Sequence, residues 1–292
     1  MMIISGEHSE ELGKKVSELS GIEFVKRTLS RFPDDELYLC LEADVEEEEV
    51  LIIENSYPDT GIVNCLLLKN ALIENGAAAV SFVVPYMGYA RQDRRFKKGE
   101  AVSIKAVLEA LANGVKCFTT IDLHKKESLN LLPPSVKRTD LTAVGTLAEY
   151  LKKKDVDIIV GPDRGSRERA KMAAKLVGCE SDYLEKKRLS GTEVQISPKH
   201  LSVKGKSVGI IDDMISTGGT ILKASENLFS LGAEKVYACC THGLFLNNIF
   251  NRLRKVCDEV VCTDTLPERE KIGVKVLSVA PLIAEWIEEN LV

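Results

Sequence analysis

Short apolar runs alternate with amphipathic stretches along almost the whole chain. The apolar runs have the length and the continuous hydrophobicity of strands that are buried on both faces. We expect strands at Ile3–Ser5, Val50–Ile53, Val80–Val84, Phe118–Ile121, Ile158–Val160, Val208–Ile211, Val236–Cys240 and Val274–Val279. The intervening pattern predicts helices at Glu10–Leu19, Ile62–Glu74, Ser103–Ala112, Thr142–Lys152, Arg167–Val177 and Thr220–Leu231. This alternation predicts an α/β protein whose mostly parallel sheets are flanked by helices.

The chain of 292 residues also contains a partial internal repeat. In both Glu74–Gly88 and Ser230–Leu244 a glycine ends a helix and an apolar strand follows. Length and repeat together predict two similar domains. Pro133-Pro134 interrupts regular structure, so we expect the boundary near Pro133–Asp140, with domains at 1–140 and 141–292. A last helix is expected at Pro281–Asn290, and the sequence leaves open whether it packs on the first domain.

The composition excludes several classes of protein. Apolar residues make up 45% and charged residues 28% of the chain, which suits a folded core and excludes a collagen, a coiled coil or a disordered tail. A net charge of −5 with only 5% aromatic residues argues against a nucleic-acid partner. No apolar run is long enough for a membrane span, and no signal peptide is recognisable. The eight cysteines are scattered, so we expect reduced thiols in a cytoplasmic protein.

The most informative stretch is Val208–Thr220, VGIIDDMISTGGT, in which a buried strand leads into two carboxylates and then a turn that opens a helix. Backbone N–H groups and hydroxyls of this turn suit one phosphate at the helix N-terminus. Asp212 and Asp213 are acceptors for neighbouring sugar hydroxyls. The stretch therefore predicts a sugar-phosphate site, because two adjacent carboxylates on a buried strand are costly without a ligand or partner. The alternative is an ordinary strand–turn–helix with exposed acids.

Other segments suggest phosphate chemistry less strongly when each is taken alone. Three arginines in Pro85–Arg95, PYMGYARQDRR, suit a triphosphate, although a solvated basic loop has the same composition. His124 follows a strand beside Asp122 and is equally suited to a metal, a phosphate or a structural role. Asp163, in GPDRG, is either a ligand at a strand end or a turn aspartate. The cluster Lys186–Arg188 by itself is typical of a solvated surface.

Taken together, these segments resemble the ribose-phosphate diphosphokinase family, also called phosphoribosyl-pyrophosphate synthetases. Val208–Thr220 resembles the phosphoribosyl-pyrophosphate loop that this family shares with type I phosphoribosyltransferases. The other matching segments occur in the family's order and are the adenine-contact segment Phe32–Glu36, the ATP loop Pro85–Arg95, the histidine segment Asp122–His124, the metal segment Gly161–Gly165 and the Lys-x-Arg motif of Lys186–Arg188. The similarity covers nearly the whole chain. The chain is also shorter than many relatives, and in this it resembles the archaeal members of the family.

This resemblance implies a fold, a reaction and a set of site residues. The fold is two tandem phosphoribosyltransferase-type I domains, and the reaction transfers the β,γ-diphosphoryl group of ATP to O1 of ribose 5-phosphate, giving phosphoribosyl pyrophosphate and AMP for nucleotide biosynthesis. ATP would be bound by Phe32, Asp34, Asp35, Glu36, Arg91, Gln92 and His124. Ribose 5-phosphate would be bound by Arg188, Asp212, Asp213, Ser216, Thr217, Gly218, Gly219 and Thr220. Catalysis would fall to Lys186, Arg188 and Arg91, and Mg²⁺ ligation to His124 and Asp163.

The resemblance also implies a homo-oligomer in which Phe32–Glu36 reaches the adenine of a neighbouring subunit. Two positions depart from many relatives: Ser216 replaces an aspartate in the phosphate loop, and Asp35 replaces a glycine in the adenine segment. Two rival functions stay open. A phosphoribosyltransferase would share Val208–Thr220 but needs neither the ATP loop nor the Lys-x-Arg motif. A non-catalytic regulatory relative would be expected to lack Lys186, His124 or the acidic pair, which are all present.

Overall fold

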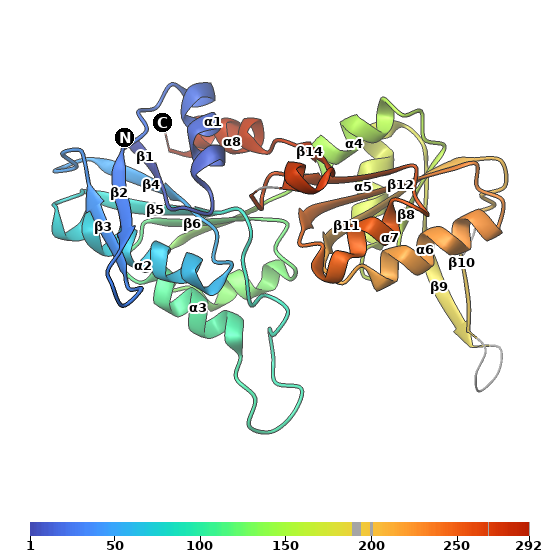
Figure 1. Cartoon of the computed structure of the whole chain (residues 1–292), viewed down its shortest axis with the longest axis horizontal. Coiled ribbons are helices and arrows are strands. Elements are labelled where there is room, and N and C mark those ends of the chain that lie inside the picture. The colour runs from blue at the N-terminus through green and yellow to red at the C-terminus, as the bar shows by residue number, and fades with distance from the viewer. Residues whose placement is uncertain (189–193, 199–200, 268, 292) are drawn as a thin grey trace. The chain divides into compact units, whose positions relative to one another are not determined.

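The computed structural model describes residues 1–188, 194–198, 201–267 and 269–291 and forms two compact units (Figure 1). Unit 1 consists of Met1–Thr142, Thr265–Pro267 and Val279–Val292. Unit 2 consists of Ala143–Asp264 and Glu268–Ser278. Within the described residues, no helix combines the length and the apolar character that crossing a membrane requires.

Unit 1 is built on a five-stranded parallel sheet with the order β1-β4-β5-β6-β7. Its strands are β1 (Met2–Ser5), β4 (Glu49–Ile53), β5 (Ala79–Val84), β6 (Cys117–Ile121) and β7 (Lys137–Leu141). Its helices are α1 (Glu10–Ser20), α2 (Asp59–Glu74), α3 (Ser103–Ala112), the short η1 (Lys126–Leu131) and α8 (Ala280–Asn290). Leu68 of α2 and Leu108 of α3 share one buried cluster with Phe82 and Phe118 of the sheet. Helices α1 and α8 pack together on the other face (Figure 1).

Unit 2 contains a seven-stranded sheet with the order β10-β9-β8-β11-β12-β13-β14, in which only the pairing of β10 with β9 is antiparallel. Its strands are β8 (Ile158–Gly161), β9 (Glu180–Arg188), β10 (Val194–Pro198), β11 (Ser207–Ile215), β12 (Lys235–Gly243), β13 (Glu259–Thr263) and β14 (Lys275–Leu277). Its helices are α4 (Val144–Lys152), α5 (Arg167–Val177), α6 (Gly219–Ser230), η2 (Leu246–Asn248), α7 (Ile249–Leu253) and η3 (Arg269–Ile272). Side chains of α4 and α5 form one buried cluster with the sheet, and those of α6 and α7 form another. Both faces of the sheet are therefore covered.

The strands and helices expected from the hydrophobic pattern coincide with observed elements to within a few residues. Pro133-Pro134 lies outside regular structure, as expected, and β7, which the pattern did not predict, begins at Lys137 and pairs with β6. The internal repeat is confirmed at its turns. Gly76 and Gly232 follow α2 and α6 with φ values of 83° and 90°, a backbone conformation that glycine adopts most easily, and β5 and β12 come next.

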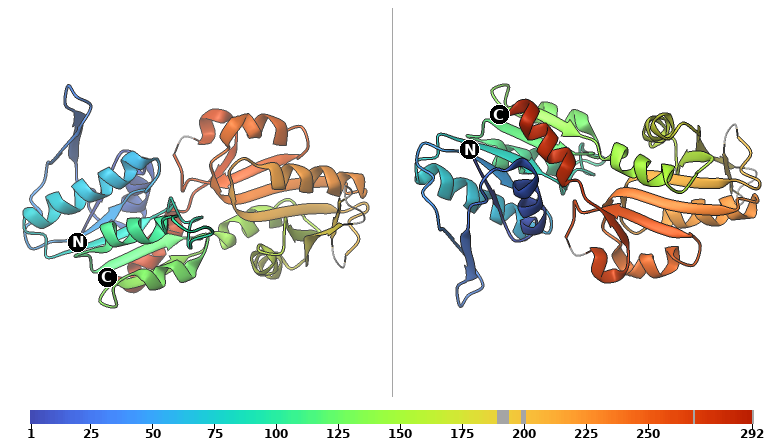
Figure 2. Two further views of the ribbon diagram at one scale, coloured as in Figure 1. Left: turned by 90° about the horizontal axis from the view of Figure 1, so that it is seen from below. Right: turned by 90° about the horizontal axis from the view of Figure 1, so that it is seen from above.

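An antiparallel hairpin of β2 (Arg27–Arg31) and β3 (Leu37–Leu41) stands out from the sheet of unit 1 (Figure 2). The hydrophobic pattern did not predict it, since its strands alternate half-buried and exposed residues over only five positions each. Leu39 and Leu41 contact the buried core of unit 1, which anchors the base of the hairpin. The hairpin carries Phe32–Glu36 at its tip.

A carboxyl group lies in the core of unit 1. Glu54 follows β4, is 0% exposed, and accepts hydrogen bonds from the backbone N–H of His8 (3.2 Å) and from Nδ2 of Asn64 (3.3 Å). Burial raises the pKa of Glu54 to about 8. The folded protein therefore keeps this carboxyl protonated at pH values at which the unfolded chain, with a glutamate pKa of about 4.3, releases the proton.

This difference predicts that stability falls as pH rises. The contribution of Glu54 to the free energy of unfolding is fully present below pH 4.3 and is lost as the pH rises towards about 8. Glu54→Gln keeps the acceptor oxygen and the volume but cannot ionise. We expect the melting temperature of the variant, relative to the unmodified protein, to increase between pH 5 and pH 8 in calorimetry. Parallel curves for the two proteins would contradict the assignment.

Candidate active site

The tip of the β2–β3 hairpin presents an aromatic ring to solvent. Phe32 is 50% exposed and lies edge-on to Tyr38, with 5.6 Å between the ring centroids. Phe32 donates its backbone N–H to the carbonyl of Glu36 (2.8 Å), and Oδ1 of Asp34 accepts from the N–H of Glu36 (3.3 Å). The tip is thus a defined turn. The exposed ring also shows that Phe32 is not part of the core of unit 1.

Asp35 occupies the position in the tip where many relatives carry glycine. Its φ is 71°, in the left-handed region that disfavours most side chains. Nη1 of Arg31 donates to the carbonyl of Asp35 (2.8 Å) and lies 3.4 Å from its Oδ1. These contacts hold the strained residue in place.

The segment after β5 has a buried beginning and an exposed remainder, which extends beyond α3 as a long loop (Figure 1). Tyr86 and Met87 are buried, whereas Arg91, Arg94 and Arg95 are exposed. We call residues 86–88 the root of the loop. The structure therefore presents the arginines to solvent on a fixed base, as a site for an anionic ligand requires.

The loop and the histidine segment are joined within unit 1. Nζ of Lys125 lies 2.7 Å from Oδ2 of Asp93, and Gln92 is held by the hydroxyl of Ser103. His124, which precedes Lys125, has an exposed side chain. Sequence reasoning did not single out Asp93 and Lys125. The sequence does place opposite charges after β5 and β6. The carboxyl ends of neighbouring parallel strands meet at one edge of the sheet, so this pattern could have predicted the ion pair.

In unit 2, Asp212 and Asp213 lie near the end of β11, as predicted. Burial and, to a lesser extent, the adjacent carboxyl of Asp213 raise the pKa of Asp212 to about 8. Nη1 of Arg169 on α5 lies 3.9 Å from Oδ1 of Asp212 and opposes this effect. The side chain of Asp212 keeps 19% of its surface exposed, so a ligand can reach it. Arg169 was also missed from the sequence.

The turn after β11 has the geometry expected of an anion site. The carbonyl of Ser216 accepts the N–H of Leu246, which fixes the turn, and α6 begins at Gly219 with Thr217 and Thr220 exposed. The first N–H groups of a helix have no partner within it, so this turn directs free donors to solvent.

The two glycines of this turn have different roles. Gly218 has a φ of 66°, and a Cβ there would collide with Ile249 of α7, so its glycine is required by the fold itself. A Cβ on Gly219 would point into open space. A ligand can therefore approach the backbone at Gly219.

Asp163 lies in the turn between β8 and α5. Its Oδ1 accepts the backbone N–H groups of Gly165 (2.8 Å) and Ser166 (3.1 Å), so one oxygen stabilises the turn. The residue as a whole is exposed to solvent. The turn role and the ligand role are therefore compatible.

Lys186 and Arg188 lie on β9, where they pair with Ile196 and Val194 of β10. Their side chains lie outside the described part of the structure. Within that part, no three His, Cys, Asp or Glu side chains are grouped so as to hold a metal ion. A divalent cation bound by only one or two of these side chains would need further oxygen ligands from a substrate.

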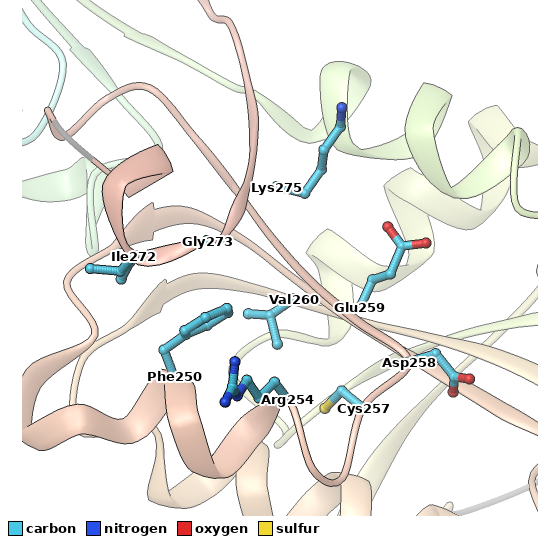
Figure 3. A pocket seen from close by; sticks show the side chains of 9 residues that line it. All are labelled: Phe250, Arg254, Cys257, Asp258, Glu259, Val260, Ile272, Gly273 and Lys275. Atoms are coloured by element: carbon cyan, nitrogen blue, oxygen red, sulfur yellow. The ribbon is translucent and has the colours of Figure 1, made fainter.

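A pocket of about 270 Å³ lies at the start of β13 and contains none of the predicted site residues (Figure 3). Its cations, Arg254 and Lys275, point in different directions (Figure 3). Its acid Glu259 is already contacted by the hydroxyl of Tyr150 and the ammonium of Lys154. The lining groups do not converge on a ligand, so the predicted residues remain the better candidates.

The chain is similar to known proteins over nearly its whole length. Residues 1–114 match the family model described as the N-terminal domain of ribose phosphate pyrophosphokinase, and residues 139–264 match the phosphoribosyl transferase domain. A ribose-phosphate pyrophosphokinase of Methanopyrus kandleri is 38% identical over 99% of both chains. Ribose-phosphate pyrophosphokinase 2 of Archaeoglobus fulgidus is 39% identical over 98% of this chain and 100% of its own length.

A solved structure shows the same fold. The phosphoribosylpyrophosphate synthetase of Mycobacterium smegmatis superposes with a TM-score of 0.86 and 27% identity, over 98% of this chain and 97% of its own. The predicted α/β class, with mostly parallel sheets flanked by helices, is therefore confirmed.

The two glycines of the phosphate turn give a matched test. Gly218→Ala adds a Cβ that must displace Ile249 at a backbone angle unfavourable for alanine, so we expect it to lower the free energy of unfolding by at least about 2 kcal/mol. Gly219→Ala adds a Cβ to open space at a helix start and should change it by no more than about 1 kcal/mol. Denaturant unfolding measures both. Equal costs would show that the turn is built differently.

Proposed function

The chain belongs to the ribose-phosphate pyrophosphokinase family, and on that premise we propose that it transfers the β,γ-diphosphoryl group of ATP to O1 of ribose 5-phosphate, releasing AMP. The observation that carries the proposal lies in unit 2, where the carboxyls of Asp212 and Asp213 precede the turn at the start of α6. Sugar hydroxyls and a phosphate need such acceptors and donors side by side. The product, phosphoribosyl pyrophosphate, serves nucleotide biosynthesis.

Ribose 5-phosphate is the proposed ligand of unit 2. The N–H groups and hydroxyls of Ser216–Thr220 hold its 5-phosphate, while Asp212 and Asp213 accept from its ring hydroxyls. An ionised carboxyl accepts these bonds more strongly than a neutral one, so binding favours the ionised form of Asp212, whose pKa burial raises to about 8. Ser216, where many relatives have aspartate, adds a donor facing the anion.

ATP is the proposed ligand of unit 1. The half-exposed ring of Phe32 stacks on adenine, Asp34 and Glu36 at the hairpin tip accept from its amino group, and Asp35 completes the ATP-binding tip. Arg91, Gln92 and His124 contact the phosphates. We further propose a homo-oligomer in which the hairpin serves a neighbouring subunit, because its ring is exposed on a projecting element (Figure 2).

Mg²⁺ is the proposed cofactor, with His124 in unit 1 and Asp163 in unit 2 as its protein ligands. The exposed side chain of Asp163 fits a cation that is held by one or two protein side chains and by substrate phosphates. When bound, Mg²⁺ neutralises charge on the diphosphoryl oxygens. Lys186, Arg188 and Arg91 stabilise charge on the moving group and the leaving phosphate.

The nearest rival is a phosphoribosyltransferase that consumes the same product. It would use the turn of unit 2 but gives no role to the hairpin tip or to the arginine loop of unit 1. Composition also favours a cytoplasmic enzyme without nucleic-acid or membrane partners. The distinguishing assay is ATP-dependent release of AMP in the presence of ribose 5-phosphate.

The AMP-release assay can distinguish the proposed catalytic lysine, Lys186, from the neighbouring Lys187. Lys186→Ala should lower turnover several hundred-fold, about 3–4 kcal/mol, because its ammonium acts mainly in the transition state, and ribose 5-phosphate binding should change little. Lys187→Ala removes the same charge from the next position of β9 and should keep turnover within about threefold. Near-normal turnover in Lys186→Ala would assign the lysine to a solvated surface.

The acidic pair is tested through the two Michaelis constants. Asp212→Asn with Asp213→Asn should raise KM for ribose 5-phosphate at least about thirtyfold, about 2 kcal/mol, and KM for ATP much less. Asp258→Asn is the control, because Asp258 bonds the N–H of Val236 at the opposite, amino end of the sheet. A larger change in KM for ATP would mean that the pair binds metal and the sugar binds elsewhere.

A further inference from the structure

Three polar residues that sequence reasoning passed over lie buried after β4. Glu54, Asn55 and Ser56 have exposed fractions of 0%, 1% and 0%. Burying polar groups costs free energy unless they are hydrogen-bonded, so the partners of these residues indicate what they hold.

Asn55 joins three distant segments of unit 1. Its Oδ1 accepts the backbone N–H of Tyr86 (2.7 Å), and its Nδ2 donates to the carbonyls of His8 (3.2 Å) and Thr265 (2.9 Å). Its own N–H donates to Oγ of Ser9 (3.1 Å). One of these segments is the root of the arginine loop.

Ser56 holds the same root at three further points. Its N–H donates to the carbonyl of Tyr86 (3.3 Å), and its Oγ accepts the N–H of Gly88 (2.7 Å). Its hydroxyl proton is directed at Sδ of Met87 (3.4 Å). A Cβ on Gly88 would lie only 3.0 Å from the carbonyl oxygen of Ser56, so the two backbones approach closely. Every residue of the root therefore contacts Ser56.

The root determines where the arginines start. Arg91 follows Gly88 by three residues, and on the far side the loop is held through Gln92, whose carbonyl accepts the N–H of Ile104. Between these points Tyr89 is fixed by its hydroxyl, which donates to Oδ1 of Asp59 (2.6 Å). A shift of the root would thus be passed to Arg91 and Gln92 over a short, constrained stretch.

We propose that Ser56 is a positioning residue for ATP binding, whose hydroxyl fixes the root so that Arg91 and Gln92 meet the phosphates of the nucleotide. The inference rests on the proposed function, because it assigns the loop to ATP. Ser56 itself does not touch the substrate. It acts by removing the freedom of the loop before ATP arrives, which lowers the entropic cost of binding.

Ser56→Ala removes only the hydroxyl and should leave the fold intact. We expect KM for ATP to rise about fivefold or more, with kcat and KM for ribose 5-phosphate within about twofold of the unmodified protein. Hydrogen exchange followed by mass spectrometry should show faster exchange in residues 85–95 of the ligand-free full chain, since the N–H of Gly88 loses its acceptor.

The matched control is Ser225→Ala. Ser225 is also 0% exposed, and its hydroxyl donates to the carbonyl of Ile221 within α6 of unit 2. This variant loses a buried hydroxyl of the same kind and should leave KM for ATP and exchange in residues 85–95 unchanged.

The outcomes are separable. An unchanged KM for ATP in Ser56→Ala, or an equal rise in both variants, would overturn the positioning role while the unmodified enzyme still releases AMP. A change in kcat alone would overturn it too, because positioning of ATP would then be intact. An unmodified protein that releases no AMP would overturn the proposed function and, with it, the role of the loop as an ATP site.

Discussion

Burial of both faces of the parallel strands is the constraint on which the rest of this structure depends. Strands such as β5 and β11 are covered by helices on both sides, so polar chemistry is confined to the ends of strands. Asp212 and Asp213 near the end of β11 and Asn55 and Ser56 after β4 all follow this rule. The fold itself therefore gathers the acceptors and donors of each unit at one edge of its sheet.

Two carboxyls at such edges differ in their degree of burial and therefore in the role that each can have. Burial raises the pKa of both Glu54 and Asp212 to about 8. Glu54 is fully enclosed and bonded to unit 1, so its neutral form serves the fold. Asp212 keeps some exposed surface beside Asp213 and Arg169, so an arriving cation or sugar hydroxyl can restore its charge. The same rise in pKa thus marks a carboxyl that affects stability in unit 1, Glu54, and a carboxyl that is a candidate for binding substrate in unit 2, Asp212.

The hydrophobic pattern was sufficient for most of the fold because helices and doubly covered strands have distinct periods. It did not predict the β2–β3 hairpin, whose short strands are half-exposed, or β7, which pairs at a sheet edge despite the preceding Pro133-Pro134. It also missed β9, β10 and β13. At the hairpin and at β7, long-range packing and pairing stabilise strands that lack a strong local signal. Asp35 shows the same principle within the hairpin, since contacts with Arg31 maintain a backbone angle that its residue type does not favour.

The sequence by itself determined the class of fold and the segments that carry chemistry, because strand ends, glycine turns and clustered charges are local features. Only the tertiary structure showed which of these residues also serve the fold. Gly218 must be glycine because a Cβ there would collide with Ile249, and Asp163 stabilises its own turn. The tertiary structure also revealed Asn55 and Ser56. The hydrogen-bond partners of their side chains lie 31 or more residues away in the sequence. Hydrogen bonds between such distant segments leave no periodicity in the sequence, since they depend on which strands the fold places side by side.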